Sequence, residues 1–146
     1  MRRFLCALIP AAFVWFYAGS GESERAEAAY MPQGVVCNNQ IVLNQTTSTD
    51  LHTFTNTGFI CYIFLVSATT QNINLVNGTG TVCATSTAGI LGGTTAATGP
   101  NLLASEGWSA GNGIGVVAQM TASASHLCLL QSSTGQISGI IRYADQ

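Results

Sequence analysis

The stretch Phe59-Ile60-Cys61-Tyr62-Ile63-Phe64-Leu65-Val66 is eight apolar residues long without interruption. A short continuous run of this kind, rich in aromatic and β-branched side chains, is typical of a strand that is buried on both faces. We expect an opposing sheet on one face and a loop or a neighbouring subunit on the other. The run therefore predicts a strand over 59–67 that needs cover on both sides.

Outside this run, residues 29–146 also read as strands and turns. They contain 17 Thr and 14 Gly with many Val and Ile, which favours strands and turns over helices. Apolar and polar residues alternate over 136–144, which indicates a half-buried strand. We expect seven strands, at about 34–44, 50–56, 59–67, 71–77, 114–121, 126–132 and 136–144. This spacing predicts an all-β fold, a single antiparallel β-sandwich that is jelly-roll-like.

Residues 84–112 do not follow the strand pattern. They contain Gly89, Gly92, Gly93, Gly99 and Gly107 with small residues between them. We expect a long Gly-rich loop across the surface at about 84–112. Loops of this length are usually functional or packed against a partner.

The first 28 residues resemble a secretory signal peptide. Two arginines at positions 2 and 3 precede an apolar run over 4–18, which predicts a signal-like helix that is too short for a membrane span. Cleavage fits after Ser20 or after Ala28, and we take 1–28 as the signal and 29–146 as the domain. Two alternatives remain, an uncleaved anchor and a start at Met31.

Four cysteines remain once Cys6 is removed with the signal peptide: Cys37, Cys61, Cys83 and Cys128. An even number of cysteines in an exported chain favours two disulfides. Three connectivities are open, of which we adopt the pairing of Cys37 with Cys61 and of Cys83 with Cys128. The alternative is four free thiols in a reducing compartment. No CxxC pair is present, so we expect no metal site.

Charged residues are scarce at 7% of the chain, and six of the ten precede residue 28. The rest of the chain has Arg142 as its one Lys or Arg, with Asp50, Glu106 and Asp145 as its acids. A single cation cannot neutralise a row of phosphates, so we expect no nucleic-acid partner. We also expect no membrane association after signal cleavage.

The same scarcity argues against enzyme chemistry. Asp50 and His52 lie two residues apart on a predicted strand, and no GxSxG motif accompanies them. The second histidine, His126, precedes an apolar run, and the three acids do not form an evident glycosidase pair. Glycines at 111, 113 and 115 have the wrong spacing for a dinucleotide loop. We therefore expect no catalytic residues, no cofactor and no enzyme activity.

Aromatic residues offer the clearest candidates for ligand contact. Trp108, Tyr62 and Tyr143 could stack on sugar rings beside Asn and Thr side chains. Trp108 falls at the end of the predicted long loop, where exposure would suit this role. The competing interpretation of Trp108 is a side chain that closes one end of the core.

Several segments together resemble a group of small exported proteins, also encoded by tailed phages and prophages, with a β-sandwich fold and no assigned activity. The most specific is Gly78-Thr79-Gly80-Thr81-Val82-Cys83, followed by Ser138-Gly139-Ile140-Ile141-Arg142-Tyr143-Ala144 at the end of the chain. The similarity spans roughly residues 35 to 144. It implies a surface or virion-associated structural protein and carries over no catalytic residues.

Two function classes follow from these observations. The first is a non-enzymatic structural or interaction protein, secreted to a cell or virion surface. It would form a homo-oligomer, or pack with other structural subunits, through charge-poor β-rich surfaces. The second is a secreted carbohydrate-binding or adhesin module that holds a surface glycan through exposed aromatics such as Trp108.

Overall fold

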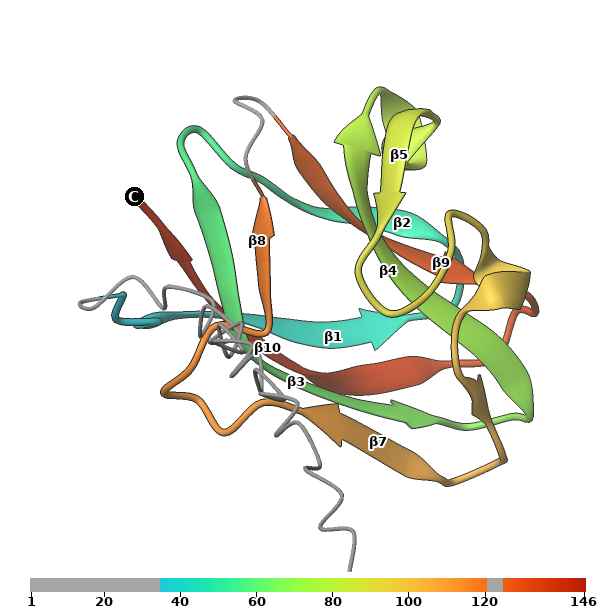
Figure 1. Cartoon of the computed structure of the whole chain (residues 1–146). Helices are drawn as coiled ribbons and strands as arrows, with labels where there is room; N and C mark the ends of the chain where they lie inside the picture. The colour runs from blue at the N-terminus through green and yellow to red at the C-terminus, as the bar shows by residue number, and fades with distance from the viewer. Residues whose placement is uncertain (1–34, 121–124) are drawn as a thin grey trace, which may run out of the picture. The chain divides into compact units, whose positions relative to one another are not determined.

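The structure is a computed structural model that describes residues 35–120 and 125–146. The predicted signal peptide and its helix lie outside these residues. The described part is all-β, and its ten strands form two antiparallel sheets consistent with a β-sandwich (Figure 1). No described helix is long and apolar enough to cross a membrane.

Sheet 1 contains the apolar run as one of its inner strands. Its strand order is β1-β10-β3-β7, and β8 also pairs with β3. The bounds are β1 Asn39–Gln45, β3 Gly58–Ser67, β7 Gly107–Ala110, β8 Ala118–Met120 and β10 Ile137–Asp145. The first and last strands of the described chain are therefore hydrogen-bonded to each other.

Sheet 2 has the strand order β2-β9-β4-β5, and β6 also pairs with β4. The bounds are β2 Thr49–Thr53, β4 Gln71–Thr79, β5 Thr85–Gly89, β6 Asn101–Leu102 and β9 His126–Gln131. Two short 3-10 turns, η1 Thr81–Cys83 and η2 Ala96–Thr98, flank β5.

The hydrophobic core lies between the two sheets and follows from the two-residue period of the strands. Ile63 and Leu65 of β3 are fully buried, whereas Phe64 between them is 37% exposed. From sheet 2, Leu75 and Leu129 join the same core cluster. This alternation assigns one face of each strand to the core and the other to the outside of the sandwich.

The outer face of sheet 2 is covered by the chain that follows β4 (Figure 1). A disulfide joins Cys83 of η1 to Cys128 of β9, and both cysteines are buried beside Val76. Further along, the buried Asn74 donates through Nδ2 to the carbonyl oxygens of Gly93 and Thr95, at 2.6 and 2.9 Å. These contacts hold residues 80–98 against sheet 2.

The expected number of strands, about seven, is wrong, because the structure has ten. The seven predicted ranges overlap β1–β4 and β8–β10. The additional strands are β5, β6 and β7, which lie within the segment predicted as a long loop at 84–112. All three are short, with five, two and four residues.

Candidate functional site

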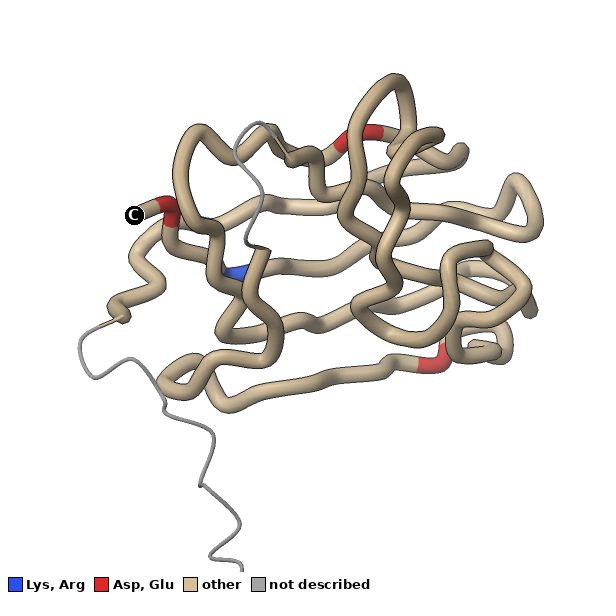
Figure 2. The backbone as a smooth tube through the Cα atoms, turned by 45° about the horizontal axis from the view of Figure 1, so that its top comes forward, with Lys and Arg blue, Asp and Glu red and all other residues tan. Residues whose placement is uncertain are grey.

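The acidic and basic residues lie at scattered positions along the described backbone (Figure 2). Two of the acids lie near histidines: His126 Nδ1 lies 3.8 Å from Asp50 Oδ1, and His52 Nε2 lies 3.9 Å from Asp145 Oδ2. Asp50 and His52, considered above as possible catalytic partners, thus face different groups. No hydroxyl or thiol in residues 35–120 and 125–146 is hydrogen-bonded to either imidazole ring. The described residues therefore hold no assembled pair of nucleophile and base.

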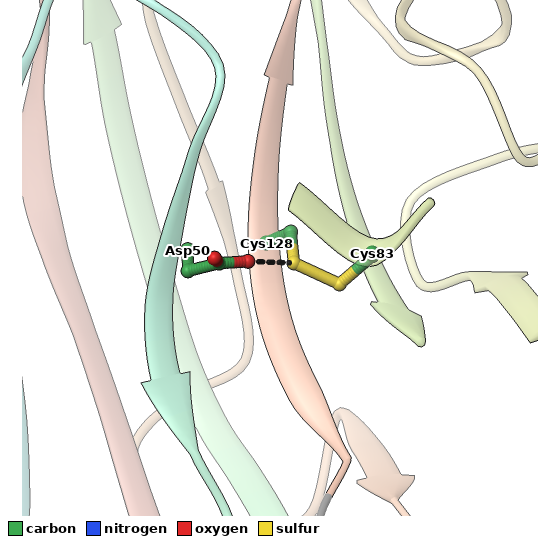
Figure 3. Close-up of side chains that lie close together, drawn as sticks. All are labelled: Asp50, Cys83 and Cys128. Atoms are coloured by element: carbon green, nitrogen blue, oxygen red, sulfur yellow. Dashed lines mark hydrogen bonds between the residues drawn. A yellow bond between two sulfur atoms is a disulfide. The ribbon is translucent and has the colours of Figure 1, made fainter. Parts of the chain in front are cut away.

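One carboxylate lies against a disulfide (Figure 3). Asp50 Oδ1 accepts a hydrogen bond from the backbone N–H of Val82 at 2.9 Å and lies 3.0 Å from Cys128 Sγ. The sulfur is bonded to Cys83, and a disulfide sulfur carries no proton, so the second contact is one of packing. Val82 and Cys83 both have a backbone φ of +54°, a conformation that residues other than glycine rarely adopt. The hydrogen bond from Val82 to Asp50 therefore stabilises a strained turn.

Asp50, Cys83 and Cys128 form the one described group whose donor atoms could surround a metal ion. The carboxylate oxygen and the two sulfurs lie within 4.8 Å of one another. Metals bind cysteine as thiolate. In this structure the two sulfurs are bonded to each other and have no thiolate to offer. The arrangement is that of a structural cross-link.

The outer face of sheet 1 differs from that of sheet 2 because apolar side chains on it reach solvent. Val42, Ile140 and Phe64 lie side by side on β1, β10 and β3, and we call these three residues the apolar row. Val42 is 65% exposed and Phe64 is 37% exposed. Val66 is half-buried on the same face. No loop among the described residues covers the row as residues 80–98 cover sheet 2.

A pocket of about 260 Å³ lies at one end of this face. Its lining residues are Tyr62 of β3, Ile140 and Arg142 of β10, and Asn112 and Gly113 of the loop between β7 and β8. Arg142 and Tyr62 are paired across the two strands, and a register shift follows Arg142. Bulges of this kind re-aim side chains at the edge of a regular ladder. We call this the Arg142 pocket.

The loop that borders the Arg142 pocket is fixed by backbone contacts. Gly111 has φ of +81°, and a Cβ there would overlap the carbonyl oxygen of Cys61. Gly113 donates its N–H to that same carbonyl oxygen at 3.2 Å. Asn112 Oδ1 accepts the N–H groups of Ile114 and Gly115, at 3.0 and 3.1 Å. Because Oδ1 is occupied, Nδ2 is the group that Asn112 has left for a ligand.

The three aromatic residues predicted for ligand contact do not share a surface. Trp108 is paired with Leu65 and packs against the core. Tyr143 also packs against the core, with its ring centroid 4.5 Å from that of His52 and 5.6 Å from that of Phe54. Only Tyr62 lies on the outer face, in the Arg142 pocket. The cysteines predicted as disulfide partners are paired as Cys37–Cys61 and Cys83–Cys128.

Sequence reasoning missed Arg142, Ile140 and Asn112 as members of a site. A signal for the first two was present, since the alternation over 136–144 puts Ile140 and Arg142 on the side opposite the core. Asn112 had no comparable signal, because its place depends on how the Gly-rich loop folds back onto β3. No known protein family, no characterised protein and no solved structure matches this chain.

Proposed function

We propose that this chain is a non-enzymatic, exported structural or interaction protein that assembles with further copies of itself at a cell or virion surface. The contact surface is the outer face of sheet 1 around the apolar row. The observation that carries the proposal is the unequal cover of the two sheets: the described residues cover the outer face of sheet 2 and leave Val42 and Phe64 of sheet 1 exposed.

The composition of β3 supports a partner on this face. The sequence of β3 is apolar on both sides, as in strands that are buried on both faces. Its inner side packs in the core, whereas Phe64 on its outer side is 37% exposed. Burying apolar surface of this kind contributes about 25 cal/mol per Å². A neighbouring subunit would supply the cover that the described residues do not.

A second copy fits this face better than a partner recognised by charge. The apolar row carries no charge, and self-association surfaces are more apolar than other protein interfaces. At the edge of the same sheet, β1 has seven residues with no charge and no proline. Charged residues and prolines are the features that normally prevent edge strands from pairing. A copy related by a two-fold axis would offer the same uncharged face in return.

The two disulfides support export. Disulfides form and persist in oxidising environments and are rare in the cytosol. They also stabilise a domain that has few ion pairs to contribute. The resemblance to small exported and phage-borne proteins motivates the location at a cell or virion surface, which is part of the proposal.

A secreted carbohydrate-binding or adhesin module remains the alternative. Its main candidate, Trp108, packs against the core opposite Leu65, so the Trp108→Ala substitution would remove a core contact along with any sugar contact. The aromatic that favours a ligand is Tyr62, because it lines a pocket.

Size-exclusion chromatography with light scattering tests the proposed assembly. The purified protein, with both disulfides intact, is expected to be oligomeric over a range of concentrations. Val42→Lys places a charge in the apolar row and is expected to give a monomer.

Leu103→Lys is the matched control, since Leu103 is 58% exposed, close to the 65% of Val42, but lies in the loop after β6. It should leave the oligomer intact. A monomeric wild type at high concentration, or equal effects of the two variants, would contradict the proposal.

A further inference from the structure

The polar groups of the Arg142 pocket include donors that have no hydrogen-bond partner among the described residues. Within residues 35–120 and 125–146, the guanidinium of Arg142 makes no ion pair and no hydrogen bond. Asn112 has its Oδ1 occupied by two backbone N–H groups, which leaves Nδ2 as a donor. Tyr62 adds a hydroxyl, which can donate or accept. A pocket lined by donors of this kind is suited to an oxygen acceptor on the ligand.

The described carboxylates are engaged elsewhere. Asp145 accepts three hydrogen bonds from Thr55 and Asn56, and Asp50 accepts one from Val82. Glu106 Oε2 accepts the N–H of Leu103 at 2.8 Å. None of the three lies within ion-pair distance of Arg142. The positive charge of the pocket is therefore open to an anion from outside the described chain.

The charge and shape of the donor set favour a carboxylate over a phosphate. A guanidinium binds a planar carboxylate through two parallel hydrogen bonds. A phosphate group carries up to two negative charges with three acceptor oxygens, and it is normally met by several cations or by a helix N-terminus. This pocket offers one cation and one amide. This donor set therefore matches a ligand that carries a single negative charge.

The remaining lining residues describe the rest of the ligand. Ile140 and the ring of Tyr62 provide apolar surface beside the donors, and aromatic rings pack well against sugar rings and apolar chains. The volume of about 260 Å³ lies below the range usual for drug-sized ligands, about 300 to 1,000 Å³. A group the size of one sugar or one amino acid is therefore appropriate.

We propose that the Arg142 pocket binds a small monocarboxylate whose carboxylate is held by Arg142 and Asn112 and whose ring or short apolar chain packs on Tyr62 and Ile140. The pocket and the apolar row share Ile140, so a ligand and a second copy would meet at this end of the face, and the inference is tested on dispersed protein. The carboxylate could belong to an acidic sugar or to a peptide. The two sources share the same recognition chemistry and are distinguished by the probes below.

The test is a titration followed by NMR chemical-shift changes of backbone amides, with the disulfides intact. The probes are glucuronate, an acidic sugar, and N-acetylleucine, a peptide-like carboxylate. Glucose serves as the probe that keeps the sugar ring and lacks the carboxylate. We expect at least one carboxylate to shift the amides of Asn112, Gly113 and Tyr62, and glucose to shift them far less. The titrations use the Val42→Asn background, which makes the apolar row more polar without adding a cation beside Ile140, the residue that the row and the pocket share.

Substitutions of Arg142 test whether its guanidinium holds the carboxylate. Arg142→Gln removes the charge and is expected to raise Kd about tenfold or more, since hydrogen bonds to charged groups are among the stronger ones. Arg142→Lys keeps the charge without the planar fork and should give an intermediate Kd. Glu106→Gln is the matched control, because it changes one charge on an exposed residue outside the pocket, and it should leave Kd unchanged.

Each outcome bears on the proposal. Binding of glucuronate alone assigns an acidic sugar, and binding of N-acetylleucine alone assigns a peptide carboxylate. The proposal is overturned if neither carboxylate binds, if glucose binds as well as glucuronate, or if Arg142→Gln leaves Kd unchanged. Light scattering of the wild type without ligand is measured separately from these titrations. The failure of this inference is therefore distinguishable from the failure of the assembly proposal.

Discussion

Asp145 is the most highly connected carboxylate of the described residues. Its Oδ2 accepts the N–H and the hydroxyl of Thr55, both at 3.1 Å, and its Oδ1 accepts the N–H of Asn56 at 2.9 Å. The side chain thereby holds the turn after β2 against the end of β10. The backbone hydrogen bond from Thr55 is the largest cause that lowers the pKa of Asp145, followed by Asn56, the Thr55 hydroxyl and His52, while partial desolvation opposes them.

This lowered pKa predicts how stability depends on pH. A carboxyl group whose pKa is lower in the folded state stabilises fully above its unfolded pKa, near 3.8, and the contribution is lost as pH falls through the folded value. Asp145→Asn is expected to reduce the free energy of unfolding at neutral pH by about 1 kcal/mol, as for loss of a capping side chain. The difference from wild type should shrink in acid.

Urea unfolding of both proteins, at neutral pH and at several values below 4, measures the effect of Asp145→Asn. Glu106→Gln is the control, because Glu106 accepts a single backbone N–H through Oε2, which a glutamine oxygen can replace. Equal stability of Asp145→Asn and wild type at every pH would show that the negative charge and the second acceptor oxygen of Asp145 do not contribute.

At the scale of elements, the two disulfides perform different tasks. Cys37–Cys61 joins the segment before β1 to β3 within sheet 1, across 24 residues of sequence. Cys83–Cys128 joins the η1 turn to β9, across 45 residues, and holds the cover of sheet 2 in place. The chain-entropy treatment gives about 3.4 kcal/mol for the shorter loop and about 4 kcal/mol for the longer one.

The difference between the disulfides leads to a prediction about their removal. The double variant Cys83→Ala/Cys128→Ala should lose more stability than Cys37→Ala/Cys61→Ala, and it alone should release residues 80–98 from sheet 2. Hydrogen exchange then measures the release, through faster exchange of the amide of Ile90, which is bonded to the carbonyl oxygen of Leu75 in β4. Equal exchange in the two variants would mean that Asn74 and its partners hold the cover without the disulfide.

The elements differ in how far the sequence could predict them. The run over 59–66 and the alternation over 136–144 identify β3 and β10, because each strand carries its own pattern of burial. β5, with the sequence TSTAG, has no apolar alternation, and its residues are all exposed or half-buried. It is held by its pairing with β4, which no local pattern records. The contact of Asp50 with Cys128, 78 residues apart, is likewise invisible along the chain.

The Arg142 pocket was beyond prediction for a related reason. Arg142 and Tyr62 become neighbours only through the register of β10 on β3, which joins residues 80 positions apart in the sequence. Asn112 joins them because Gly111 permits a close approach to Cys61 that a side chain would prevent. Sequence patterns report which face a residue occupies, whereas a pocket depends on which strands and loops meet.

At the scale of the whole molecule, the scarcity of charge predicts how the proposed assembly responds to salt. The described chain has one arginine and three acidic residues, which lie apart from one another (Figure 2). Sodium chloride screens charged interactions and has little to act on at the apolar row. Sulfate strengthens apolar burial, because it is excluded from protein surfaces. The apparent Kd of self-association should therefore stay nearly constant with sodium chloride and fall in ammonium sulfate, as measured by sedimentation equilibrium. Dissociation in sodium chloride would assign the contact to charged groups, Arg142 foremost, in place of Val42 and Phe64.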